Sequence, residues 1–334
     1  MTKECDVISV GDIVTDLFIK LLPDQAHTYD NEHGAWLAMP FGTKIPYDNL
    51  ETIQAVGNAA NASVAFARLG LNSALTSNVG EDHYGRSMIS ALHKSGVDSH
   101  LVHINPGKLS NVHFVLRYDV ERTILIKHEA YDYHWPHLHA AEVPKWLYFS
   151  SISDHAIDYH DEVADWLDEH PQVKLAFQPG TFQMAAGTER LKRIYRRTEV
   201  LIVNREEAVL ITGGDYHDIE DLLKRMHNLG TKIAVITDGP AGAVASDGRK
   251  AYKMPPYPDP APPVERTGAG DAFAATFVAA LIKGNTIEGA LQWAPINSMS
   301  VVQQVGAQAG LLNEKQLEEY LSQSPDWYQP EALD

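Results

Sequence analysis

Trp146-Leu-Tyr-Phe-Ser150 is the first of four short apolar runs that alternate with amphipathic segments in the second half of the chain. We expect the apolar runs to be strands and the segments between and after them to be helices. The predicted strands are 146–150, 173–178, 199–203 and 232–237, and the predicted helices are 156–169, 188–197, 205–211 and 218–229. Strands that are apolar throughout are typical of a parallel sheet with helices on both faces. The sequence therefore predicts an α/β fold with three layers and a mainly parallel central sheet.

The same alternation extends toward both ends of the chain. Asp6-Val-Ile-Ser-Val-Gly11 is predicted to be a buried strand that ends at a glycine. A predicted helix at 59–69, a strand at 73–79 and a helix at 84–95 follow, and the last third holds predicted helices at 269–283, 286–304 and 313–322. We expect residues 324–334 to be a tail, and residues 1–334 to form a single domain.

Two segments that interrupt this alternation predict a small β-sheet lid. Residues 17–56 are rich in aromatic and turn-forming residues, and polar–apolar alternation returns there only in patches. Residues 112–118 and 123–127 flank a turn and are predicted to form a hairpin. We expect about residues 17–56 and 111–128 to form the lid.

The composition is that of a globular protein with an acidic surface. Among 334 residues there are 44 Asp and Glu against 27 Lys and Arg, so the formal net charge is −17. Such a surface repels nucleic-acid phosphates and anionic membranes, so we expect neither as a partner. The single cysteine, Cys5, cannot form a disulfide within the chain, and no apolar run approaches the roughly 18 residues that span a bilayer. The N-terminus lacks the form of a signal peptide, so we expect a cytoplasmic protein.

The loop Thr267-Gly-Ala-Gly-Asp271 precedes a strongly helical apolar run, 272–281. Its glycines let the backbone approach an anion closely, and the free N–H groups and dipole of the helix start favour negative charge. These properties suit a phosphoryl group in transfer, and Asp271 is then placed to act as base for an attacking hydroxyl. The alternative is that the glycines and the aspartate only cap a core helix.

This loop resembles the C-terminal signature of the ribokinase-like (PfkB) carbohydrate and nucleoside kinases, Asp-Thr-x-Gly-Ala-Gly-Asp. Four further segments resemble family motifs in the family's order: Gly57-Asn-Ala-Ala-Asn61 running to Gly70, Val79-Gly-Glu-Asp82 with Gly85, Asn204-Arg-Glu-Glu207, and Thr237-Asp-Gly239 running to Gly242. The resemblance covers roughly residues 5 to 322. It implies a ribokinase-like fold and transfer of a phosphoryl group from ATP.

The resemblance also implies catalytic roles in the loop. Asp271 is the base on the substrate hydroxyl, and the backbone of Gly268, Ala269 and Gly270 forms the anion hole.

The nucleotide-binding residues that the resemblance implies are Asn204, Glu207, Thr237, Gly239, Gly242 and Asn297. Asn204 and Glu207 organise Mg²⁺ through water near the phosphates, as oxygen ligands suited to a hydrated cation. A capping box at a helix start accounts for the spacing of these two residues as well. Asn297, with residues 306–307 beyond it, lies where the family surrounds adenine.

For the acceptor, Asp16, Gly57 and Asn61 match positions that bind sugar hydroxyls, since a carboxylate and an amide can take a vicinal diol as paired hydrogen bonds. Asn111, at the start of the hairpin, reaches the substrate from the lid. The alternatives are a turn carboxylate for Asp16 and a helix-face amide for Asn61.

Several positions depart from the family pattern. Val56 replaces the first glycine of a Gly-Gly pair, which narrows the substrate floor or shifts the backbone. Glu265 and Arg266 replace the Asp and Thr before the loop, and Gly310 replaces a later Ser, which weakens the case for activation by a monovalent cation such as potassium. Arg266 instead brings a positive charge near the phosphates or forms a surface ion pair. Gln178 opens a Gln-Pro-Gly sequence in place of Asp-Pro-Asn, so contacts from that strand end cannot be transferred.

Other features favour no different class of protein. His134, His137 and His139 lack the spacing of a metal site on a helix, and we expect a polar loop there. No Gly-x-Gly-x-x-Gly follows the first strand, which disfavours a dehydrogenase. The aromatic lid residues Trp36 and Phe41 suit stacking on a nucleobase, sealing against a larger sugar, or a homodimer contact through the lid.

The sequence thus predicts an ATP- and Mg²⁺-dependent kinase that phosphorylates a hydroxyl of a sugar or ribonucleoside, with a ribose-type acceptor favoured. One alternative is a hexose or hexose-phosphate kinase, although a phosphorylated acceptor requires added Arg or Lys in the pocket. The other is a catalytically silent sugar- or nucleotide-binding regulator on the same fold.

Overall fold

The computed structural model describes residues 4–32, 34–119 and 121–333. Within these residues the strands form a ten-stranded central sheet in the order β16-β15-β14-β13-β12-β11-β10-β1-β6-β7, a four-stranded sheet in the order β5-β2-β8-β9, and a two-stranded hairpin, β3-β4. The strands of the central sheet are β1 (Val7–Val10), β6 (Ser73–Gly80), β7 (Val102–Asn105), β10 (Trp146–Phe149), β11 (Lys174–Phe177), β12 (Thr198–Asn204), β13 (Ile233–Thr237), β14 (Ala243–Ser246), β15 (Ala251–Met254) and β16 (Glu331–Leu333).

The central sheet is parallel from β7 to β13 and antiparallel from β13 to β16. Strands β1 and β10 are buried along their whole length, which explains why their sequences are apolar apart from Ser9. Since the carboxyl ends of parallel strands meet at one edge of a sheet, loops that are distant in sequence gather there.

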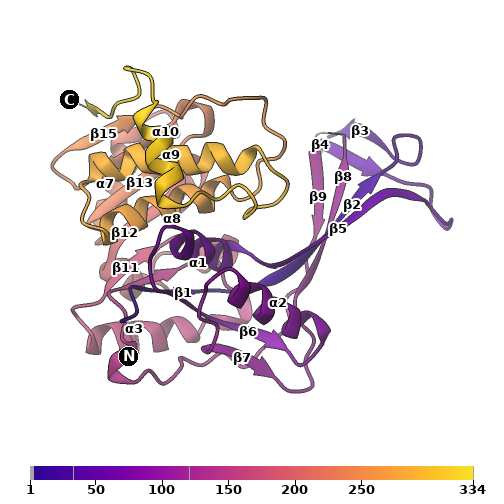
Figure 1. Cartoon of the computed structure of the whole chain (residues 1–334), viewed down its shortest axis with the longest axis horizontal. Helices are drawn as coiled ribbons and strands as arrows, with labels where there is room; N and C mark the ends of the chain where they lie inside the picture. Colours follow the sequence, from indigo (N-terminus) through magenta and orange to yellow (C-terminus); the bar gives the residue numbers. More distant parts are fainter. Residues whose placement is uncertain (1–3, 33, 120, 334) are drawn as a thin grey trace.

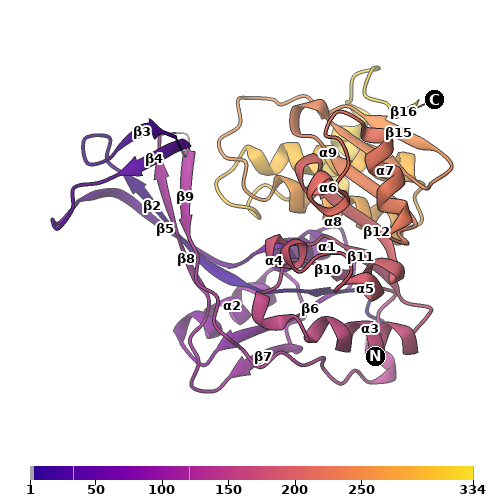
Figure 2. The same ribbon diagram turned by 180° about the vertical axis from the view of Figure 1, so that it is seen from behind.

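Helices cover both faces of this sheet. One layer holds α1 (Asn58–Arg68), α2 (His83–Lys94), α8 (Ala269–Ile282), α9 (Ile287–Val302) and α10 (Glu314–Ser322), on the near side in Figure 1. The other holds α3 (Tyr159–Glu169), α4 (Thr181–Ala186), α5 (Lys192–Arg197), α6 (Arg205–Thr212) and α7 (Ile219–Asn228), in front in Figure 2. Each layer encloses its own hydrophobic cluster against the sheet. The predicted three-layer α/β/α fold is confirmed.

Helix α8 is the element that positions the predicted catalytic loop. Its buried face is mostly alanine, so it packs closely between α1 and α9. Its first turn therefore lies against the first turn of α1, although the two helices are about 200 residues apart in sequence.

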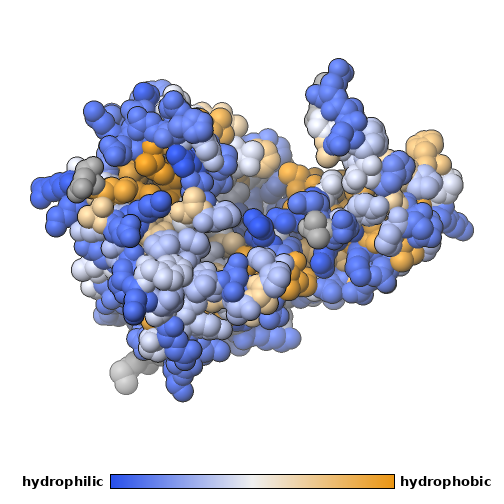
Figure 3. Space-filling model, turned by 90° about the horizontal axis from the view of Figure 1, so that it is seen from above, coloured by the Kyte–Doolittle hydropathy of each residue, from blue (hydrophilic) through white to orange (hydrophobic). Residues whose placement is uncertain are grey.

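The lid consists of β2 (Val14–Leu21), β3 (His27–Asn31), β4 (Gly34–Ala38), β5 (Tyr47–Val56), β8 (Val112–Tyr118) and β9 (Glu121–Leu125). Strand β2 pairs antiparallel with β5 and parallel with β8, so the lid sheet is mixed. The lid projects from the side of the main body (Figure 1), and in Figure 3 apolar residues occur on the lid and near the place where it joins the body.

One prediction of secondary structure was wrong, and two predicted helices are shorter than expected. Residues 324–333 are not a free tail: Tyr328 is fully buried, and β16 pairs with β15. The helix predicted at 188–197 begins at Lys192, and the helix predicted at 156–169 begins at Tyr159. Among the described residues, no helix combines the length and hydropathy needed to cross a bilayer.

Candidate active site

The loop 267–271 lies between two cavities. The first cavity, of about 400 Å³, is lined by Thr267 and Asp271 together with α1 and the inner face of the lid. The second, of about 420 Å³, is lined by Arg266, Ala269 and Gly270 together with α9 and the loops after β13 and β15. Groups bound in the two cavities would therefore meet at the first turn of α8.

The conformation of this loop depends on its first glycine. Gly268 is the N-cap of α8 with a φ of 80°, in the left-handed region. A Cβ atom at this position would lie 2.3 Å from the Cβ of Ala307, so no other residue fits. Within the described residues, the N–H groups of Ala269 and Ala272 have backbone partners, whereas those of Gly270 and Asp271 have none. Free N–H groups at a helix start form an anion site.

Asp271 is buried and held by three side-chain amides. Its Oδ1 accepts hydrogen bonds from Nδ2 of Asn58 at 2.8 Å and from Nε2 of Gln178 at 3.2 Å, and its Oδ2 accepts one from Nδ2 of Asn61 at 2.8 Å. Burial raises the pKa of Asp271, and the hydrogen bonds from Asn61, Gln178 and Asn58 oppose that rise. The result is a fixed carboxylate with increased basicity.

Asn61 is itself held from the opposite side. Its Oδ1 accepts a hydrogen bond from Nε2 of Gln308 at 3.0 Å, and Gln308 also donates to the backbone oxygen of Ala55 at 2.7 Å. Asn61 lines the first cavity, but both ends of its amide already have protein partners. Asn61 thus contacts Asp271 directly, and its predicted role on a sugar hydroxyl stays a prediction, since Nδ2 has a second hydrogen.

The backbone beside Val56 is unusual on both sides. Ala55 adopts a φ of 56°, in the left-handed region that an alanine rarely occupies, and Gly57 follows with a φ of 108°. Such a conformation costs roughly 1–2 kcal/mol for a residue with a Cβ atom. Val56 lines the first cavity.

Two aspartates near the start of the chain line the first cavity, and they differ in their hydrogen-bond partners. Asp12 accepts hydrogen bonds from Tyr133 Oη and from the N–H of Ser153, both at 2.8 Å, and is therefore an anchor within the protein. Asp16, on β2, has its Oδ1 buried without a hydrogen-bond partner among the described residues. Burial, with the negative charge of Glu265, raises the pKa of Asp16 to about 6, and Arg122 opposes the rise.

Glu265 and Gly310 have structural roles. The carboxylate of Glu265 accepts hydrogen bonds from Oγ1 of Thr267 and from the N–H of Gly306, the second at 3.0 Å, so it ties the loop to the segment after α9. A Cβ atom on Gly310 would lie 2.3 Å from the backbone oxygen of Ser300, so a serine does not fit in this backbone. Both replacements are built into the packing around the loop.

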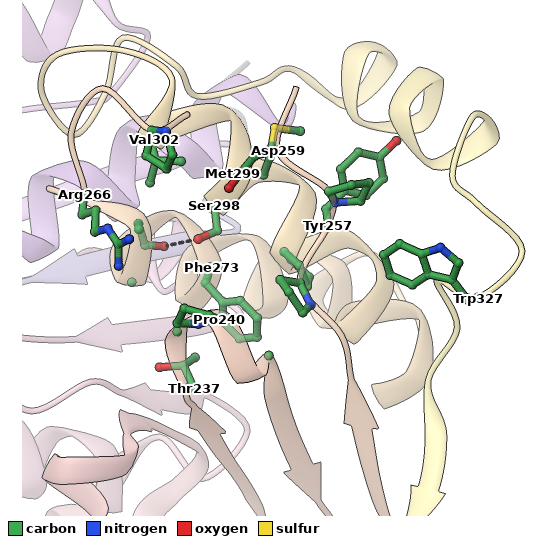
Figure 4. A pocket seen from close by; sticks show the side chains of 18 residues that line it. Thr237, Pro240, Tyr257, Asp259, Arg266, Phe273, Ser298, Met299, Val302 and Trp327 are labelled. Carbon is green, nitrogen blue, oxygen red and sulfur yellow. Dashed lines mark hydrogen bonds between the residues drawn. The ribbon is translucent and has the colours of Figure 1, made fainter. Parts of the chain in front are cut away.

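The second cavity has the features of a nucleotide site. Thr237, Gly239 and Gly242 line it, as the sequence predicted, and Arg205 ties this loop to α6 through an ion pair with Asp238. Figure 4 shows Tyr257 and Trp327 at one end of the cavity and Arg266 at the end near the first turn of α8, where Ser298 donates to the backbone oxygen of Ala269. Arg266 has no ion-pair partner among the described residues, so its charge is available to an anion.

Asn204 and Glu207 form the capping box that the sequence also allowed. Oδ1 of Asn204 accepts from the N–H of Glu207, and Oε2 of Glu207 accepts from the N–H of Asn204, both at 2.8 Å. Among the described residues, Oε1 of Glu207 has no hydrogen-bond partner. Burial raises the pKa of Glu207, and the charge of Asp271 adds to the rise. The unpartnered Oε1 of Glu207 is an oxygen donor of the kind that would hold a hydrated divalent cation through water.

Five predicted site residues line neither cavity: Gly268, Asn204, Glu207, Asn297 and Asn111. Asn297 is fully buried, donating to Oγ1 of Thr276 at 2.8 Å and accepting from the N–H of Leu312 at 2.9 Å, so it joins α8 and α9 to the following segment. Asn111 is also buried, and its Oδ1 accepts from the N–H of Glu129 at 2.8 Å. Residues 306–307 line the first cavity rather than the second, where we expected them.

Several site residues were not predicted. Asn58, Gln178 and Gln308 complete the network around Asp271, and His113 and His128 line the first cavity. Asn58 lies within the N-terminal motif, and Gln178 is the last residue of a predicted strand, and these positions could have indicated both residues. Within the described residues, no group of three or more His, Cys, Asp or Glu is arranged to hold a metal, and His134 pairs instead with Asp132 and Glu162.

Comparison with known proteins identifies the family and the fold. Residues 49–314 match the pfkB family carbohydrate kinases. The chain is 26% identical to an ATP-dependent 6-phosphofructokinase of Thermoanaerobacterium thermosaccharolyticum, over 91% of this chain and 90% of the relative, and 29% identical to a ribokinase of Bacillus subtilis, over 80% and 87%. The solved ribokinase of Arabidopsis thaliana, complexed with ribose and ATP, superposes with a TM-score of 0.76 at 21% identity, over 95% of this chain and 99% of the other.

The family match extends over most of the chain, and the fold is the ribokinase fold. The chain belongs to the pfkB family of carbohydrate kinases and is an enzyme of the sugar and nucleoside kinase class.

Proposed function

We propose that the protein transfers the γ-phosphoryl group of ATP to a hydroxymethyl group of an unphosphorylated sugar or ribonucleoside, with a ribose-type acceptor favoured. The observation that carries this proposal is the position of the loop 267–271 between two cavities, with Asp271 facing the first and Ala269 and Gly270 the second. The acceptor then binds in the first cavity and ATP in the second.

Asp271 acts as the base in this reaction. The acceptor hydroxyl gives its proton to the carboxylate as its oxygen bonds to the γ-phosphorus, and the bond from that phosphorus to the bridging oxygen breaks, so ADP leaves with the electron pair. Burial raises the pKa of Asp271, which makes it a better proton acceptor, while the amides of Asn58, Asn61 and Gln178 hold it in one orientation.

The transferring group is stabilised by fixed positive charge. The N–H groups of Gly270 and Asp271 point out of the first turn of α8, and the helix dipole adds to their field. Arg266, at the edge of the second cavity, adds a full positive charge beside the phosphates. Glu207 and Asn204 would hold Mg²⁺ through water, and the ion would supply further charge compensation for the phosphates.

Charge in the first cavity favours a neutral acceptor. Among the described residues, no Lys or Arg lines this cavity, whereas Asp12, Asp16 and Asp271 do line it. A sugar phosphate would face three carboxylates with no cationic partner, which disfavours the hexose-phosphate alternative despite the 26% identity to a 6-phosphofructokinase. The ribokinases among the similar proteins support a ribose-type acceptor.

The lid has a role in excluding water. Its inner face lines the first cavity through Phe18, Ile53 and Ile126, so its closure over a bound acceptor protects ATP from hydrolysis. A homodimer contact through the lid remains a prediction, for which the fully exposed side chain of Phe41 is the motivating observation.

A coupled assay of ADP release tests the proposal. Purified protein is incubated with ATP and Mg²⁺ and with ribose, fructose, fructose 6-phosphate, adenosine, cytidine or inosine in turn. We expect at least one neutral acceptor to stimulate ADP release above the rate without acceptor. A chain that binds these compounds and ATP in calorimetry, yet releases no ADP with any of them, would instead be the catalytically silent regulator.

A further inference from the structure

The inner face of the lid carries a polar pair within an apolar surface. Successive side chains of a strand point to opposite faces of the sheet, so Val14, Asp16 and Phe18 on β2 share one face, and all three line the first cavity. Asp16 pairs in register with Ile53 on β5 and with His113 on β8, which both line the same cavity. Asp16 and His113 are therefore direct neighbours in the roof of this cavity.

These polar groups have too few partners within the protein. The closest approach between Asp16 and His113 joins Oδ1 to Nδ1 at 3.6 Å, beyond hydrogen-bond distance. Oδ1 of Asp16 and Nε2 of His113 are buried without a hydrogen-bond partner among the described residues. Nδ1 of His128, which lines the same cavity, is also buried without a partner, so there are three such atoms among the described residues. An unsatisfied buried polar group costs roughly 1–3 kcal/mol, so the three atoms together require an explanation.

His128 is the third member of the group. It follows β9, and its ring lies edge-on to that of His113 with 5.5 Å between the ring centroids. Its Nδ1 lies 3.5 Å from Oδ2 of Asp12, but that oxygen already accepts a hydrogen bond from the N–H of Ser153 at 2.8 Å. The ring of Phe182 contacts His128 on another side, at 5.4 Å between centroids, and provides no hydrogen bond.

A packing role does not explain the two histidines. Besides Asp12 and Asp16, the cavity lining near the two histidines includes the apolar Phe18, Ile53 and Ile126, so a phenylalanine would fill the same space without an unpartnered nitrogen. A ligand with hydroxyl groups supplies what these atoms lack. A neutral imidazole has one N–H donor and one acceptor nitrogen, which matches a hydroxyl that both accepts and donates, and a carboxylate accepts from the next hydroxyl.

We propose that His113 and His128 are specificity-determining residues of the acceptor site, which with Asp16 bind the secondary hydroxyl groups of the acceptor on the side remote from Asp271. The acceptor is thus a neutral polyol that is bound at both ends. His113, His128 and Asp16 bind its secondary hydroxyls, and Asp271 binds the hydroxyl that reacts. This inference rests on the proposed kinase function, and it assigns the discrimination among neutral sugars and nucleosides to the lid.

The inference is tested with two variants of one residue and a matched control. His113→Phe keeps the ring volume and removes both nitrogens, and His113→Gln keeps a donor and an acceptor. The control is His27→Phe, because His27 is an exposed histidine of the same lid that lines neither cavity. Each protein is assayed with the best acceptor of the ADP-release screen and with its deoxy analogues: 2-deoxyribose for ribose, or 2′-deoxyadenosine and 3′-deoxyadenosine for adenosine. Calorimetry gives acceptor Kd without turnover, and thermal unfolding checks the fold.

For His113→Phe we expect the KM and Kd of the parent acceptor to rise about tenfold, with kcat changed less than about threefold, because the lost hydrogen bonds bind the acceptor and not the reacting atoms. We expect the wild type to discriminate against one deoxy analogue by about tenfold and His113→Phe by less than about twofold, with partial recovery in His113→Gln.

Unchanged KM and unchanged discrimination in a folded His113→Phe protein would overturn the inference while leaving the kinase function intact. If His113→Phe does not fold, the same comparison on His113→Gln decides, because a shifted pattern of deoxy discrimination supports the inference and an unchanged one refutes it. A wild type that phosphorylates no acceptor at all would refute the kinase function itself.

Discussion

Nδ2 of Asn61 lies 2.8 Å from Oδ2 of Asp271, and this hydrogen bond joins the first turn of α1 to the first turn of α8. On its other side Asn61 accepts from Gln308, so the amide is oriented before any substrate binds. The N-terminal motif thereby acts on the base in the C-terminal motif, and the two motifs form one site.

Replacing Asn61 by leucine therefore changes catalysis through Asp271. The hydrogen bond from Asn61 lowers the pKa of Asp271, so its loss raises that pKa, and protonation then removes the base at a higher pH. We expect kcat at neutral pH to fall about 10- to 100-fold and the acid limb of the kcat profile to move to higher pH. Asn49→Leu, at an exposed position of the lid, is the control. An acid limb that stays in place in Asn61→Leu would contradict this role.

Asp16 gives the acceptor affinity its own pH dependence. Burial raises the pKa of Asp16 to about 6, so the carboxylate gains a proton as the pH falls below that value and can no longer accept a hydrogen bond on both oxygens. We expect the KM of the acceptor to rise about tenfold between pH 7 and pH 5, since only about a tenth of Asp16 is ionised one unit below its pKa.

The variant Asp16→Asn isolates this effect from the titration of Asp271. It cannot ionise, so its acceptor KM is expected to be high and nearly constant over the same range, whereas kcat keeps its acid limb. If the KM of Asp16→Asn still rises toward pH 5 as in the wild type, another group is responsible.

Phosphorylated sugars are expected to be poor ligands of the first cavity. Like charges about 4–6 Å apart repel by roughly 3–4 kcal/mol at an effective dielectric constant of 20, which corresponds to a factor of roughly 100 to 1,000 in affinity. The three aspartates of the cavity have no Lys or Arg beside them among its described lining residues. We expect kcat/KM for fructose 6-phosphate to be at least about 100-fold below that for the best neutral acceptor, and its Ki as a competing ligand to be correspondingly high. A preference for the phosphorylated sugar would show that cationic groups reach the site from elsewhere.

The C-terminal segment is expected to stabilise the whole domain. Tyr328 is fully buried, its hydroxyl donates to the backbone oxygen of Gln292 at 2.8 Å, and its ring lies against Tyr257. Tyr328→Ala should lower the free energy of unfolding by about 3–5 kcal/mol, as other truncations of buried aromatic residues do. The neighbouring Trp327 is 56% exposed, so Trp327→Ala should change the stability by no more than about 0.5 kcal/mol. Equal effects of the two substitutions in chemical denaturation would refute this placement.

The parts of the fold that local sequence determines were predictable. Strands such as β10 and β12 are apolar because helices cover both faces, and this pattern is visible without any tertiary information. The end of the chain was not predictable in this way, because β16 gains its partner only from β15, about 80 residues earlier. Its aromatic residues pack against α9 and the connector before α8, contacts that no local pattern encodes.

In the candidate site, too, residues within contiguous motifs were predictable, and residues placed by tertiary contacts were not. Asp271 and its loop were predicted because the motif is contiguous, and Thr237 was predicted for the same reason. Gln178 and His113 were not predicted because their roles depend on tertiary contacts. Gln178 donates to Asp271 at the start of α8, and His113 lies beside Asp16 on the neighbouring lid strand. Asn297 was assigned to the nucleotide site from its position in the chain, whereas in the structure its amide satisfies buried polar groups between helices.

The most direct test of the account is the kcat of Asp271→Asn in the ADP-release assay, with ATP affinity measured on the same protein by calorimetry. The substitution keeps the size of the side chain and its contact with Asn58 and removes the base. We expect kcat to fall by about 10²- to 10⁴-fold, while the Kd of ATP with Mg²⁺ changes less than about threefold. An Asp271→Asn protein that turns over acceptor at the rate of the wild type would contradict it.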